Sequence, residues 1–262
     1  MLAPLNVLTY NSFKGRSISP KKVIMIFKSL IKVDSITCVS KNDGIGALIF
    51  IAIYAVLSYF GLKWILRNER YIYYQIVAQL IWLAVIVIIV IFRKQGLSSL
   101  GFNKEPVPYI AVAAFTVIAI AYAIWQSNYD LIGRWFFYLI AVGGLEEVLF
   151  RGFAYPRVAK LFNSPWSALI LTGLLFGAMH QIAPMIWNNA PWYGVFSQLG
   201  GGLIGTLFFL LIYASTGNIT NAILVHAALD FSANVPFLGI LSILYIVILF
   251  VFKKRKRIKK SY

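Results

Sequence analysis

The sequence predicts an all-α membrane protein, a polytopic bundle of about eight transmembrane helices. The chain has 262 residues, of which 60% are hydrophobic and only 12% are charged, about half the charged fraction of a soluble domain. Its mean hydropathy is +0.80. Apolar segments of about 17–25 residues recur along the chain, the length that a helix needs to cross a hydrocarbon core of about 30 Å. Transmembrane β-barrels are built from short segments of alternating polarity, and this sequence has no such pattern.

The apolar segments define eight predicted spans, with ends good to a few residues. The fourth and seventh spans contain polar residues and would score weakly on hydropathy alone. Both are retained because their polar positions suit the buried interior of a bundle. The spans lie at about 45–65, 72–92, 108–125, 132–154, 166–186, 193–214, 217–233 and 236–252.

Basic residues are concentrated outside the spans and predict the topology. Seven of the 24 basic residues precede the first span and seven more follow the last, between Lys253 and Lys260. Under the positive-inside rule both ends face the cytoplasm and its anionic lipids, which an even number of spans satisfies. Lys63, Arg67 and Arg70 in the first loop oppose this assignment. We expect membrane lipids and no nucleic acid as partners, and a multi-pass protein of a bacterial cell membrane.

Three regions follow from this pattern: a basic N-terminal segment (1–42), a transmembrane bundle (43–252) and a basic tail (253–262). Within the first, residues 20–36 place Lys21, Lys28 and Lys32 on one helical face. This favours a helix in the headgroup plane, although a plain basic leader explains it equally well. The single cysteine, Cys38, excludes an intrachain disulfide.

A small set of ionisable residues lies inside the spans and marks the candidate site. A charge at the bilayer centre costs about 2.5–3.5 kcal/mol, so such groups are expected to meet one another. Three of the eight acidic residues, both histidines and one arginine lie inside the spans and away from the first three residues at either end. At about 1.5 Å per residue along each helix, they can share one layer nearer the middle of the membrane than either surface. The six are Glu146, Glu147, Arg151, His180, His226 and Asp230.

The first motif is the segment GGLEEVLFRGF, in which Glu147 and Arg151 are four residues apart. Residues at this spacing share a helical face, so an ion pair between them is expected. Glu146 is turned about 100° away from Glu147 on an α-helix and has no such partner. A carboxylate in this position is suited to act as a general base or acid.

Two further motifs carry the histidines. Phe176 precedes His180 by one turn and can place its ring on the same face. His226 and Asp230 are four residues apart and present both side chains to one point, as two metal ligands or two groups around one substrate oxygen need. Ordinary packing, or a His–Asp hydrogen bond between two buried groups, also explains these spacings.

These three motifs, EExxxR, FxxxH and Hxxx(N/D), in this order on successive helices, resemble the CPBP family, also called Abi. This family contains the CAAX proteases and the bacteriocin-processing or immunity proteins. The resemblance covers about residues 105–235 and implies an eight-helix intramembrane peptidase in which glutamate and histidine activate water. It assigns Glu146, Glu147, His180, His226 and Asp230 as catalytic, with Arg151 and Phe176 as supporting residues.

Asp230 departs from the eukaryotic CAAX-processing pattern, in which this position is usually Asn. An amide can donate a hydrogen bond to an oxyanion, whereas an ionised carboxylate would repel it. Asp230 is therefore expected to be protonated, to orient His226, or to bind a cation with His180 and His226. Two histidines and one carboxylate form a known zinc set, so a Zn²⁺ site at these three residues and metal-free catalysis both remain open.

The leading hypothesis is an intramembrane (metallo)endopeptidase, a hydrolase that cleaves a peptide or protein substrate in a cavity open towards the cytoplasm. The alternative is a bacteriocin self-immunity membrane protein that acts without obligatory proteolysis. A proton-coupled transporter would also use acid and histidine residues, but the sequence lacks repeated halves with broken helices. The sequence does not identify the substrate, its prenylation or the oligomeric state.

Overall fold

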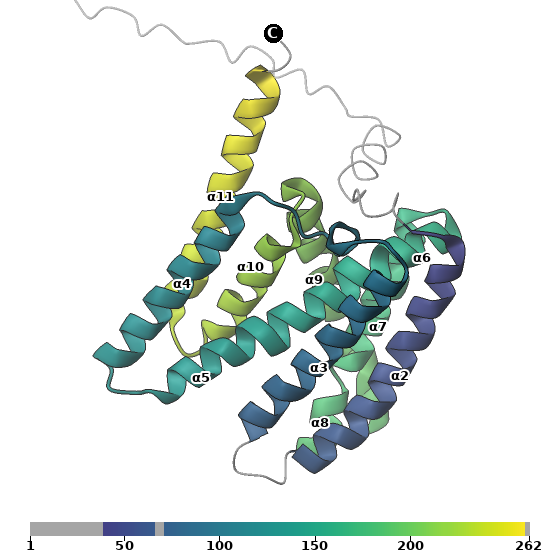
Figure 1. Cartoon of the computed structure of the whole chain (residues 1–262). Coiled ribbons are helices and arrows are strands. Elements are labelled where there is room, and N and C mark those ends of the chain that lie inside the picture. Colours follow the sequence, from purple (N-terminus) through teal and green to yellow (C-terminus); the bar gives the residue numbers. More distant parts are fainter. Residues whose placement is uncertain (1–38, 66–70, 260–262) are drawn as a thin grey trace, which may run out of the picture.

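The structure, a computed structural model, describes residues 39–65 and 71–259 of the chain. Every regular element in these residues is helical and no strand occurs among them, which confirms the all-α prediction (Figure 1). The predicted interfacial helix at 20–36 lies outside the described residues, as do Arg67 and Arg70.

Eight helical segments coincide with the eight predicted spans. Five are long and apolar enough to cross a membrane by length and composition, and the last two spans contain shorter apolar helices, Ile219–Phe231 and Pro236–Val251. The protein is therefore a multi-pass helical membrane protein. Two 3₁₀ turns, η2 (Leu97–Leu100) and η5 (Trp192–Gly194), lie in the connections. The elements are α2 (Lys41–Ile65), α3 (Tyr71–Phe92), α4 (Pro106–Trp125), α5 (Asp130–Phe136), η3 (Phe137–Gly144), η4 (Glu147–Ala154), α6 (Tyr155–Phe162), α7 (Pro165–Met179), α8 (Ile182–Trp187), α9 (Val195–Thr216), α10 (Ile219–Phe231) and α11 (Pro236–Lys259).

Two short connections make successive helices pack as neighbours. Asn163 ends α6 in the left-handed conformation, and the Ser164 side chain accepts a hydrogen bond from the first turn of α7. In the same way Gly217 ends α9 with φ of 72°, and Asn218 caps α10. Left-handed Gly or Asn residues stop a helix, and Ser or Asn side chains start the next. The chain therefore reverses within two residues at each connection.

Glycines allow α7 and α9 to approach backbone to backbone. A Cβ atom added to Gly202 would lie 2.4 Å from the Cα atom of Gly177, and one added to Gly173 would lie 2.9 Å from Leu203. Small residues at such positions are typical of membrane helix pairs. The close contact fixes α7, which carries Phe176 and leads into His180, against α9.

The structure differs from the predicted spans at three places. The fifth span is interrupted, because α7 ends at Met179 and α8 begins at Ile182 after a turn at His180. The fourth span is part of one continuous helix that runs from Asp130 to Phe162. The last helix continues to Lys259, so most of the predicted basic tail is helical.

Candidate active site

The long helix that runs from Asp130 to Phe162 supplies both glutamates. It is π-helical on both sides of Leu145 and Glu146, in η3 and η4. π-helical turns are rare and occur mostly at functional sites. Here Gly143 packs directly on α10, since an added Cβ would lie 2.5 Å from the Ile223 carbonyl oxygen. This contact brings the glutamates next to the helix that carries His226.

Glu147 forms the buried centre of the cluster. Its Oε1 atom lies 3.1 Å from Nη1 of Arg151, which confirms the predicted ion pair. Both side chains are fully buried. Arg151 also donates a hydrogen bond of 3.2 Å to Oγ1 of Thr206 on α9, and its guanidinium lies 4.1 Å from the centre of the Phe176 ring. Arg151 therefore provides the countercharge and ties three helices to Glu147.

His226 on α10 is oriented by Glu147. Its Nδ1 atom lies 2.7 Å from Oε1 of Glu147, and its ring stacks on Phe209 at 4.3 Å with an angle of 17° between the planes. A carboxylate paired with Arg151 can only accept, so Nδ1 is the donor in this contact. The Nε2 atom then faces Glu146 and Asp230, whose carboxylate oxygens lie 3.9 Å and 3.6 Å away.

The main chain orients His180 in the way that Glu147 orients His226, by accepting a hydrogen bond from Nδ1. Its Nδ1 atom lies 2.8 Å from the Phe176 carbonyl oxygen, which can only accept, so Nδ1 is again the donor. The Phe176 ring packs edge-on against the imidazole at 4.4 Å, as the sequence predicted. The Nε2 atom of His180 lies 3.9 Å from Oε2 of Glu146. Both imidazoles thus present Nε2 to the same carboxylate oxygen.

Glu146 lies close to both imidazole rings without a direct bond to either. Its Oε2 atom is buried and has no hydrogen-bond partner among the described residues. The two 3.9 Å separations are too long for direct hydrogen bonds. Polar groups at such separations are commonly bridged by a water molecule in active sites.

A cavity of about 320 Å³ adjoins Glu146 and His180. Residues of α2 and α3, among them Tyr54, form its other wall. The cavity extends towards Ile65, the end of α2 opposite to Asp43. That the cavity opens towards the cytoplasm stays a prediction.

The donor set does not fit a metal ion in this structure. Across residues 39–65 and 71–259, no group of three His, Cys, Asp or Glu side chains is arranged to hold one. In the predicted set, His226 lies 3.6 Å from Asp230, while His180 contacts Glu146 instead. A Zn²⁺ site at these residues stays a prediction, and no step proposed below passes through it.

The structure brings all seven predicted residues into one connected cluster, although their catalytic roles stay predictions. Asp230 lies at its edge, with a side chain that is 43% exposed. Sequence reasoning missed three contributors, Tyr54, Thr206 and Phe209, which come from α2 and α9. These helices carry no motif and read as ordinary apolar spans, so only the packing reveals them.

Comparison with known proteins finds matches to part of the chain. The uncharacterized protein YyaK of Bacillus subtilis is 32% identical over 83 residues, which is 32% of this chain and 26% of that protein. The chain therefore matches about a quarter of the length of this relative. No solved structure matches the chain. Residues 128–232 match the family model described as type II CAAX prenyl endopeptidase Rce1-like. This segment spans both glutamates and both histidines, and the family model that it matches agrees with the resemblance of the three motifs.

Proposed function

We propose that the protein is an intramembrane endopeptidase that hydrolyses a peptide bond with a water molecule activated by Glu146. The observation that carries this proposal is the buried, unbonded Oε2 atom of Glu146, which faces the Nε2 atoms of His180 and His226 at 3.9 Å each. The match to CAAX endopeptidases over residues 128–232 supports the same reaction class.

In the first step, Glu146 takes a proton from the water molecule while the water oxygen attacks the scissile carbonyl carbon. His180 holds this water through Nε2, because its Nδ1 atom is committed to the Phe176 carbonyl. The attack forms a tetrahedral intermediate whose former carbonyl oxygen carries a negative charge.

His226 stabilises that oxyanion as an imidazolium. Its Nε2–H group points towards Glu146 because Glu147 accepts from Nδ1, and the Glu147 carboxylate compensates the ring's positive charge. Donors fixed in advance at a developing charge are usually the largest single contribution to catalysis. When the intermediate collapses, the C–N bond breaks and protonated Glu146 returns its proton to the leaving amine.

Glu147 and Arg151 act as positioning residues and do not touch the substrate in this scheme. Asp230 lies 3.6 Å from Nε2 of His226, beside the proposed oxyanion position. It therefore acts there in its protonated form, in which it can donate a hydrogen bond as an Asn would. The substrate is a peptide or protein that reaches the cavity from the end of the bundle opposite to the basic termini.

The test compares Glu146→Gln with the matched change Glu105→Gln. Glu105 is exposed and its side chain caps no helix, so its replacement leaves the site intact. New peptide termini are measured by mass spectrometry in membranes of cells that carry each variant. We expect wild-type cleavage for Glu105→Gln and a loss of about 10²–10⁴-fold for Glu146→Gln.

A folded Glu146→Gln protein that cleaves at the wild-type rate would overturn the mechanism. Folding is checked by thermal unfolding of both variants in detergent. Bacteriocin protection that survives replacement of Glu146, His180 and His226 would instead support an immunity role without proteolysis.

A further inference from the structure

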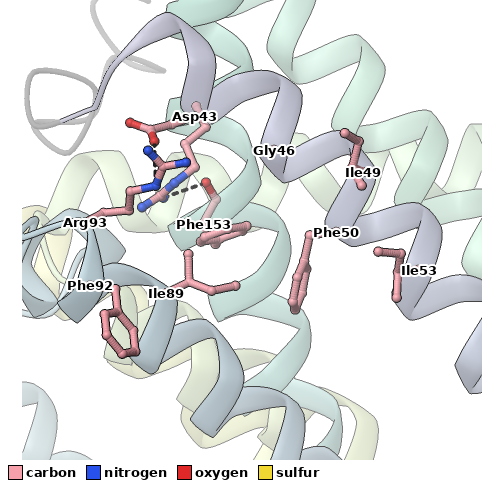
Figure 2. A pocket seen from close by; sticks show the side chains of 10 residues that line it. Asp43, Gly46, Ile49, Phe50, Ile53, Ile89, Phe92, Arg93 and Phe153 are labelled. Carbon is pink, nitrogen blue, oxygen red and sulfur yellow. Dashed lines mark hydrogen bonds and ion pairs between the residues drawn. The ribbon is translucent and has the colours of Figure 1, made fainter.

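A second cavity lies at the other end of the groove between α2 and α3. It has a volume of about 390 Å³ and is lined by charged residues at one end and apolar residues along its length (Figure 2). The rings of Phe50 and Tyr54 pack edge-on against Trp82 at 5.6 Å and 5.2 Å. These three rings separate the second cavity from the one that contains Glu146.

The charged end holds more positive than negative charge. Arg157 is only 2% exposed, yet its guanidinium donates to neutral acceptors, the Phe153 carbonyl at 2.8 Å and the side-chain oxygen of Gln95. No carboxylate among the described residues lies within ion-pair distance of it. A buried cation normally has a paired anion, whereas Arg157 has hydrogen bonds and the Phe153 ring, 4.1 Å from its guanidinium, in place of a directly paired carboxylate.

Arg93 adds a second positive charge that is only partly compensated. Its Nε atom lies 3.6 Å from Asp43, and its side chain is 59% exposed. The Asp43 carboxylate already accepts hydrogen bonds from the Ser40 amide and hydroxyl and from Gln95, each at 2.8 Å. Much of the accepting capacity of Asp43 is therefore already used, and Arg93 has donors free to bind an anion.

The remaining wall of the cavity is apolar and faces outwards. Ile49, Ile53 and Phe92 line it and are largely exposed on the surface of the bundle. Figure 2 shows Asp43 and Arg93 at one end, with Ile49 and Ile53 further along α2. A free anion would leave this wall unused, whereas a lipid would cover it.

The geometry points to a binding site for one anionic phospholipid between α2 and α3. The phosphate group contacts Arg93 and Arg157, and an acyl chain lies along Ile49, Ile53 and Phe92. The charged residues are at the first turn of α2 and directly after α3, the level at which headgroups meet helix ends. This is also the basic face of the protein, which the topology prediction assigns to the cytoplasmic leaflet and its anionic lipids.

Such a lipid would join two helices that otherwise meet mainly through aromatic rings. Both helices also form the far wall of the cavity at Glu146. Lipid bound at one end of the groove would therefore hold the wall at the other end in place, without contacting the reacting groups.

The test measures lipid binding to the full chain in detergent by native mass spectrometry and by the shift in unfolding temperature. The probes are phosphatidylglycerol, phosphatidylcholine and inorganic phosphate. Arg93→Gln is compared with Lys94→Gln, which removes the same charge one residue outside the cavity lining. We expect phosphatidylglycerol to bind at least about 10-fold more tightly than phosphatidylcholine, and Arg93→Gln to abolish that preference. Lys94→Gln should retain it.

A second pair of variants tests occupancy without changing charge. A Cβ atom at Gly46 meets no atom within 4 Å and would point into this cavity, while one at Gly200 on α9 is equally unobstructed. We expect Gly46→Leu, and not Gly200→Leu, to block phosphatidylglycerol binding. Equal effects of Arg93→Gln and Lys94→Gln, or an unfolding shift reproduced by inorganic phosphate alone, would overturn the lipid site.

Discussion

Two polar clusters line the groove between α2, α3 and the long helix, and they differ in how their charges are satisfied. The cluster around Glu147 contains three carboxylates and one arginine, and Arg151 is directly ion-paired with Glu147. The cluster around Arg157 contains two arginines and one carboxylate, which pairs with Arg93, while the buried Arg157 donates only to neutral oxygens. The first cluster therefore has excess acceptors and the second has excess donors. This contrast indicates chemistry with water at one end and anion binding at the other.

The largest loss of stability is expected from replacing Arg151, which is directly ion-paired with Glu147. Arg151→Met leaves the fully buried Glu147 without its cation, and breaking a buried ion pair in this way costs about 3–5 kcal/mol. The free energy of unfolding in detergent micelles measures the loss. Adding Glu147→Gln to Arg151→Met should recover most of it, because neither position of the former ion pair then carries a charge. A double variant as unstable as the single one would contradict the charge explanation.

An intermediate loss of stability is expected from a larger side chain at Gly44, next to the charged end of the second cavity. A Cβ atom at Gly44 would lie 2.6 Å from the Arg157 carbonyl oxygen and from Leu161, whereas the space at Gly46 is open. Gly44→Ala should therefore destabilise the protein by about 1–3 kcal/mol, while Gly46→Ala should not destabilise it. Thermal unfolding of the two alanine variants, which differ by two positions on α2, provides the comparison. Equal stability would mean that α2 moves freely over α6.

The smallest loss of stability is expected from replacing Arg157, which has no directly paired carboxylate among the described residues. Arg157→Met removes hydrogen bonds to Gln95 and to the Phe153 carbonyl, but it also removes a buried charge that has no direct counterion. These changes oppose each other, so we expect a net loss of about 1 kcal/mol or less. The same unfolding measurement, made without added anionic lipid, tests this. A loss as large as that of Arg151→Met would show that the two arginines are equivalent.

The sequence was sufficient to predict the helices, because each span is encoded locally by a long apolar segment and its polar ends. It also predicted the Glu147–Arg151 pair, since both residues lie on one helix. The contact of His226 with Glu147 was not foreseen, because it joins residues 79 positions apart and depends on how α10 is rotated. Thr206 and Phe209 were missed for the same reason. The π-helical turns were not predicted because no residue type specifies them.

Those π-helical turns make the length of the long helix as important as its chemistry. Hydrogen bonds in η3 and η4 run from residue i to i+5, one residue more than in an α-helix. Deleting a single residue such as Val142 would let the main chain return to ordinary α-helical bonding. The wider π-helical turn absorbs one extra residue, so the residues before the deletion would keep nearly their orientation while the turn beside Glu146 and Glu147 would narrow. Such a deletion should accordingly disturb the surroundings of the two glutamates while the helix from Asp130 to Phe162 stays continuous.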